Sequence, residues 1–210
     1  MRLIAVVMIA LVAPAHAQPS DQRLVLTGLA MAPPTYVAGV ALHEGSHALA
    51  ALIVGAQVEQ LHVFPPGIDP STHTFRFGWT YVRGLRTRGA QIVFYLAPKL
   101  TDVALLGGFA ALVLTGAWPH NAYGQLALTV FATGLWIDFS KDVVLFSRTN
   151  DVVKVLDRWG MTGWRQIPAR LVYAGMTVGL GVLVARGYQR TFDQAPSEMV
   201  TVVPLLATRF

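Results

Sequence analysis

Three ionisable residues lie within a stretch that is otherwise apolar and small, VALHEGSHALAALIVG, from Val40 to Gly55. His43, Glu44 and His47 have the spacing H-E-x-x-H. On a helix, residues four positions apart share a face, so both imidazoles can bind one ion while Glu44 stands beside an open coordination position. Zinc is the usual occupant of such a site, and it makes a bound water acidic enough to act as a nucleophile near neutral pH. The motif therefore predicts a zinc centre with Glu44 as general base.

The two histidines also allow a purely structural interpretation, in which they form hydrogen bonds to neighbouring helices. Ionisable residues at membrane depth are costly, however, and here three occur together with the spacing of metal ligands. Their neighbours are small residues that let other helices approach closely: Gly45, Ser46, Ala48, Ala50 and Ala51. The chain has no cysteine, so any metal must be bound by His, Asp or Glu.

The composition indicates the environment of this motif. Of the 210 residues, 54% are hydrophobic and only 13% are charged, which is too apolar for an ordinary soluble domain. An integral membrane protein in a lipid bilayer is therefore expected. The net charge is +5, but the basic residues are scattered between long apolar stretches and form no basic face, so nucleic acid is not an expected partner. The sequence indicates no oligomeric state.

Long apolar segments predict the elements that position the motif. Residues 1–17, MRLIAVVMIALVAPAHA, have the charge, short apolar run and small-x-small ending of a secretory signal peptide. Four segments of spanning length follow, roughly Pro34–Val54, Ala90–Trp118, Tyr123–Phe146 and Ile167–Ala185. We therefore expect residues 18–190 to form an all-α integral membrane bundle of about four transmembrane helices.

The linker 55–89 between the first two spans has a different pattern. QVEQLHVF and THTFRFGWTYV alternate apolar and polar residues around the turn-forming PPGIDPS, which predicts a β-hairpin. Basic residues gather in this linker and before the fourth span, whereas the PHNA turn between the second and third spans has none. The positive-inside rule then places the hairpin in the cytoplasm. The mature N-terminus and a C-terminal tail, 191–210, are expected outside it.

A helix bearing HEGSHALAALIVGA, a β-hairpin after it and a later helix followed by an Asp-containing segment resemble the site-2 protease family of intramembrane zinc metalloproteases. The resemblance covers roughly Val40 to Leu156 and is greatest to the small bacterial members that consist of little more than the catalytic core. It implies a zinc endopeptidase of the bacterial inner membrane that hydrolyses a membrane-protein or peptide substrate in or near the membrane.

The same resemblance implies a third zinc ligand, an Asp within a pattern of the type N-x-x-P-x-x-x-L-D-G. The nearest match is DFSKDVVLFSRTNDVVKVL, in which Asp151 takes the place of the ligand while the expected Asn, Pro and Gly are missing. Asp151 could instead cap the helix that follows, together with Asn150.

Three other aspartates are alternatives for the third ligand. Asp138 and Asp142 share a face of the third span and lie at about the depth of the two histidines. Asp102 follows Lys99 by three residues, so an internal ion pair is its simpler role.

Two function classes follow from these residues. The first is a zinc-dependent endopeptidase that uses His43, Glu44, His47 and Asp151. The second is a non-catalytic membrane scaffold, or a metal-handling protein, that retains the fold. A metal-handling protein that transports ions would be expected to show further carboxylates along a pathway across the bilayer.

Overall fold

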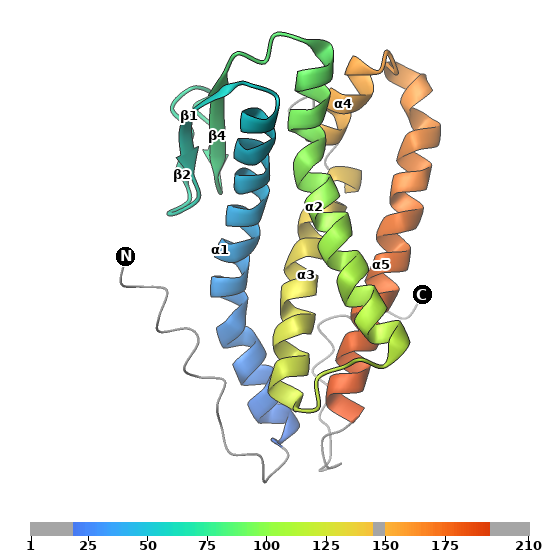
Figure 1. The fold of residues 1–210 in the computed structure, drawn as a ribbon. Helices are drawn as coiled ribbons and strands as arrows, with labels where there is room; N and C mark the ends of the chain where they lie inside the picture. The colour runs from blue at the N-terminus through green and yellow to red at the C-terminus, as the bar shows by residue number, and fades with distance from the viewer. Residues whose placement is uncertain (1–18, 145–149, 194–210) are drawn as a thin grey trace.

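The computed structural model describes residues 19–144 and 150–193, so the predicted signal peptide and the tail from residue 194 lie outside the described residues. The elements are α1 (Asp21–Ile53), β1 (Gln57–His62), β2 (Gly67–Ile68), β3 (Phe75–Arg76), β4 (Trp79–Arg83), α2 (Arg88–Thr115), α3 (Ala122–Val144), α4 (Asp151–Arg158), the short 3-10 helix η2 (Gly163–Gln166) and α5 (Ile167–Asp193). The long helices form a bundle, and the strands lie beside one end of α1 (Figure 1).

Within the described ranges, three helical stretches are long and apolar enough to cross a membrane: α1, α2 and Gly163–Phe192. The structure thus confirms a mainly helical membrane protein and leaves the fourth span a prediction. That span corresponds to α3, which carries Gln125, Asp138 and Asp142 among its apolar residues. It packs against α1, α2 and α5, where such side chains can find protein partners.

Two helices are longer than predicted. α1 begins at Asp21, where the Ser20 hydroxyl accepts a hydrogen bond from the Arg23 N–H at 3.4 Å, and it continues through Pro33 and Pro34. The predicted start at Pro34 was therefore too late. α5 continues to Asp193, so the first residues of the predicted tail are helical.

The predicted β-hairpin is present. β1 and β4 pair antiparallel, from Gln57 opposite Arg83 to His62 opposite Trp79, with one irregularity between Val58 and Gln60. The segment expected to be turn material contains β2, and it extends the hairpin because β2 pairs with β3. The hairpin packs on α1.

The hairpin turn is held by its own polar contacts. Asp69 is buried and accepts hydrogen bonds from Tyr81, Ser71 and Thr72, and it pairs with Arg76 at 3.0 Å. Burial raises the pKa of Asp69, but these hydrogen bonds outweigh it and hold that pKa well below its usual range. The turn therefore buries a carboxylate whose charge is locally compensated.

Gly78 sets how closely the hairpin approaches α1. A Cβ built on Gly78 would lie 2.7 Å from Val40 Cγ1, 2.9 Å from Glu44 Cγ and 2.9 Å from the His62 carbonyl oxygen. The backbone just before β4 therefore touches α1 at the H-E-x-x-H motif, and only glycine leaves room for that contact.

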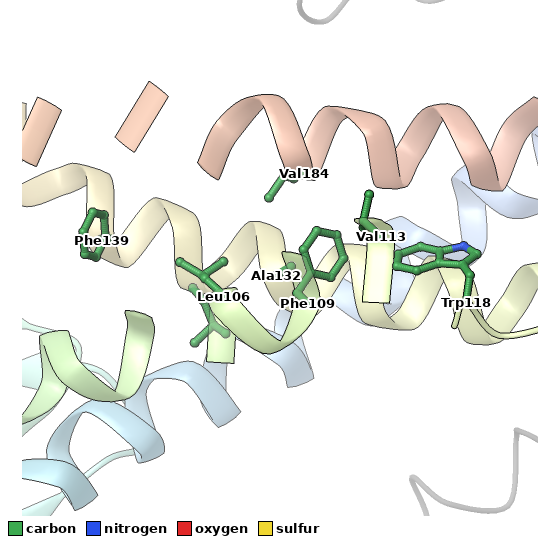
Figure 2. Packing of buried hydrophobic residues seen from close by; sticks show 8 residues of the cluster. Leu106, Phe109, Val113, Trp118, Ala132, Phe139 and Val184 are labelled. Carbon is green, nitrogen blue, oxygen red and sulfur yellow. The ribbon is translucent and has the colours of Figure 1, made fainter. Parts of the chain in front are cut away.

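The main apolar core lies between α2, α3 and α5. Leu106, Phe109 and Val113 of α2 meet Ala132 and Phe139 of α3 and Val184 of α5, with Trp118 closing one end (Figure 2). This packing holds α2 and α3 side by side, and it directs the polar residues at the end of α3 towards α1 and α2.

We expect Gly78→Ala to destabilise the packing of the hairpin on α1. The added methyl group has no space, and overpacking of this kind costs about 1–3 kcal/mol. The measurement is thermal unfolding of the detergent-purified protein. Gly67→Ala is the matched control, because a Cβ there meets only Trp79, at an ordinary 3.9 Å. Equal melting temperatures for the two variants would contradict the close contact at Gly78.

Candidate metal centre

The structure brings His43, His47 and Asp151 together from two elements far apart in the sequence. One ligand atom from each residue lies within 4.8 Å of the other two. Asp151 Oδ2 is 3.1 Å from His47 Nε2 and 3.6 Å from His43 Nε2. The histidines lie one turn apart on α1, and Asp151 begins α4, so the predicted trio forms a single group in which His47 is buried and His43 and Asp151 are half-buried.

The second nitrogen of each imidazole is already bonded. His47 Nδ1 lies 2.8 Å from the Phe94 carbonyl oxygen, and His43 Nδ1 lies 3.0 Å from Asp138 Oδ2. When Asp138 is ionised both partners are acceptors, so each Nδ1 donates to its partner and each Nε2 faces Asp151. If a metal ion binds here, the two Nε2 atoms and the Asp151 carboxylate are the atoms that would hold it.

Asn150 explains how Asp151 reaches the histidines. Its side-chain oxygen accepts hydrogen bonds from the Val152 and Val153 N–H groups at 2.8 and 3.4 Å, which caps α4. The capping role that the sequence offered to Asn150 and Asp151 together therefore falls to Asn150. Asp151 is left in the first turn, with its carboxylate directed at His43 and His47.

The other candidate aspartates take different positions. Asp138 contacts Nδ1 of His43 rather than the Nε2 that faces Asp151. It is not part of the ligand group found among the described residues. Asp102 and Asp142 each lie 3.0 Å from Lys99 Nζ. The ion pair predicted for Asp102 and Lys99 is thus present, and the sequence did not indicate that Lys99 also pairs with Asp138 and Asp142.

Glu44 is buried beside the group and is held by the hairpin. Its Oε2 accepts a hydrogen bond from the Thr80 hydroxyl at 2.7 Å, and the same hydroxyl lies 3.1 Å from the Glu44 carbonyl oxygen. Sequence reasoning missed Thr80, because a threonine in a strand is ordinary and its partner lies 36 residues away. The alternation of apolar and polar residues in THTFRFGWTYV predicted the strand. It was the only feature of the sequence that indicated a position for Thr80 near this end of α1.

A helical membrane protein with an H-E-x-x-H helix and an aspartate facing its histidines belongs, by fold and site, to the class of candidate membrane metallopeptidases. The model of the family described as Peptidase M50B-like matches residues 3–182, which is most of the chain. The chain belongs to this family, and the resemblance to site-2 proteases is confirmed. Comparison with curated proteins and with solved structures gave no match.

We expect Asp151→Ala to lower the zinc content of the purified protein from about one ion per chain to well below half, since three protein ligands are the usual minimum for such a site. Metal analysis after dialysis measures this. Asp157→Ala is the matched control on the same short helix, because Asp157 is exposed and contacts Gln166 rather than the histidines. Equal zinc contents in the two variants would exclude Asp151 as a ligand.

Proposed function

We propose that this integral membrane protein is a zinc-dependent intramembrane endopeptidase, in which His43, His47 and Asp151 hold zinc and Glu44 is the general base. The observation that carries the proposal is the convergence of the three ligand atoms within 4.8 Å, with each imidazole oriented through its Nδ1. A pair of histidines with only a structural role would not need an anionic third group facing both Nε2 atoms.

The chemistry follows from the residues around the site. Zinc, when bound, polarises a scissile carbonyl and acidifies water. Glu44 takes a proton from the attacking water and passes it to the leaving amine. Thr80 orients the carboxylate through Oε2, so Oε1 is the oxygen that handles the proton. Burial of Glu44 excludes bulk water, which strengthens these electrostatic effects.

The substrate must be extended when it is cut, because the carbonyl groups of a helix are already hydrogen-bonded. We propose that a membrane protein or membrane-adjacent peptide pairs with an edge of the β1–β4 sheet, as strand addition to an exposed edge allows. Thr80 supports this proposal because it belongs to β4 and contacts Glu44 directly. The same strand would then position both the substrate backbone and the general base.

The proposed location is the bacterial inner membrane, with the hairpin in the cytoplasm and the mature termini outside. The arrangement of the bundle supports this orientation. The hairpin and α4 lie at one end, whereas α1 begins and α5 ends at the other (Figure 1). Basic residues occur at the hairpin end both in the linker 55–89, as Arg83 and Arg88, and in α4, as Lys154 and Arg158.

Glu44→Gln should lower cleavage of a membrane-spanning test peptide at least about 100-fold, because loss of a general base has effects of that size. Zinc content should be unchanged, since Glu44 is not among the ligand atoms. Turnover at the wild-type rate would refute the mechanism. A wild-type protein that binds zinc but cuts no peptide would support the metal-handling alternative, and one that binds no metal would support the scaffold.

Thr80→Val should reduce kcat about tenfold without changing zinc content, because it removes a hydrogen bond to a charged group at nearly constant volume. Thr80→Ser should restore most of the activity. Thr74→Val is the control in the same hairpin, since Thr74 bonds to Thr72 and Arg76 and not to α1. If Thr80→Val and Thr74→Val turned over at the same rate, Thr80 would have no role in orienting Glu44.

A further inference from the structure

Lys99 lies at the centre of a buried cluster between α2 and α3. Its side chain is 4% exposed. The ammonium group lies 3.0 Å from Asp102 Oδ2, 2.8 Å from Asp138 Oδ2 and 3.0 Å from Asp142 Oδ2, and it also donates to the Asp138 carbonyl oxygen at 3.1 Å. A single lysine therefore holds three carboxylates from two helices close together.

Two of these carboxylates continue to the candidate metal site. Asp138 Oδ2, which contacts Lys99, also lies 3.0 Å from His43 Nδ1. Asp142 Oδ1 accepts a hydrogen bond from Asn150 Nδ2 at 2.8 Å, and Asn150 caps the helix that begins with Asp151. Lys99 is thus connected to His43 by one route and to Asp151 by the other.

The two routes join His43 and Asp151 through Lys99, in addition to the packing of α4 on α2 and the hydrogen bond from Arg158 Nε to Gln91 Oε1 at 2.7 Å. His43 belongs to α1, whereas Asp151 follows the end of α3 by several residues. Asp138 and Asp142 would repel each other without the ammonium group between them. Removal of a group that hydrogen-bonds to a metal ligand, and so orients it, commonly changes the metal affinity 10- to 100-fold.

We propose that Lys99 is a positioning residue that sets His43 relative to Asp151 and so assembles the metal site from α1, α2, α3 and α4. The inference rests on the proposed zinc site and deepens it. Asp102 provides an internal contrast, because it contacts Lys99 but lies on neither route. A lysine that only compensates buried charge would serve all three aspartates alike.

The first test measures the zinc Kd of the full-length protein in detergent by competition with a chelator. Lys99→Met should raise the Kd at least about tenfold. Lys99→Met with Asp102→Asn should recover thermal stability, because one uncompensated carboxylate is removed, yet its zinc Kd should stay raised. Lys141→Met is the control, since Lys141 contacts the other Asp138 oxygen from a half-exposed position. Its zinc Kd should change less than about threefold.

A second pair of variants decides the question even if Lys99→Met fails to fold. Asp142→Asn leaves a single acceptor oxygen, which cannot accept from both Lys99 and Asn150, so it breaks one route. Asp102→Asn makes the same change in a carboxylate that contacts Lys99 but lies on neither route. Positioning predicts a zinc Kd about tenfold higher for Asp142→Asn and near the wild-type value for Asp102→Asn. The visible spectrum of the cobalt-loaded Asp142→Asn protein should also change, because it reports the geometry of the bound ligands.

Several results would overturn the inference. Equal zinc Kd values for the Asp142→Asn and Asp102→Asn variants would do so, as would a wild-type Kd in the Lys99→Met protein or its restoration by Asp102→Asn. These tests measure zinc binding rather than cleavage. If the wild-type protein binds zinc but cuts no peptide, the endopeptidase proposal is refuted, and the zinc Kd values of the variants still decide the role of Lys99. A wild-type protein that bound no zinc would overturn both proposals.

Discussion

An ionisable side chain inside an apolar bundle must find a partner, because removal of a charge from water costs several kcal/mol even after the protein relaxes. This constraint governs the end of the molecule that holds the H-E-x-x-H motif. Glu44, His47, Lys99, Asp102 and Asp142 are all buried. Each is paired across elements or within α2, so the helices that carry them cannot shift independently.

The position of α3 follows from this requirement. Its apolar residues pack against α2 and α5 in the core, while Asp138 and Asp142 near its end face Lys99. Three carboxylates share one buried ammonium group, and the half-exposed Lys141 also pairs with one of them, Asp138. Asp138 in turn contacts His43 Nδ1, which leaves His43 Nε2 directed at Asp151.

The hairpin contributes to the same site from outside the helix bundle. Gly78 brings its backbone against α1, and Thr80 then reaches the carboxylate of Glu44. A sheet that offers strand edges is thereby coupled to the residue proposed to handle the proton. In an intramembrane peptidase, this coupling would unite the two requirements of hydrolysis, an extended substrate and an oriented base.

Local periodicity in the sequence was enough to predict much of this architecture. The spacing of His43 and His47 determines that they share a helical face, alternation in the linker predicts strands, and apolar length predicts the membrane helices. The start of α1 was predicted too late, because a cap at Ser20 and a helix that tolerates Pro33 and Pro34 depend on context.

The partners of the motif were decided by tertiary structure. Counting depth placed Asp138 and Asp142 level with the histidines, yet the structure brings Asp151, at the start of α4, to both Nε2 atoms. Each residue turns a helix by about 100°, and the packing of α3 directs Asp138 and Asp142 to Lys99 instead. Thr80 contacts Glu44, and Lys99 contacts Asp138 and Asp142, across segments that lie far apart in the sequence. Local sequence patterns do not predict which of these segments meet. The sequence by itself therefore determined the chemistry of one helix, and only the packing of the other elements decided which residues complete it.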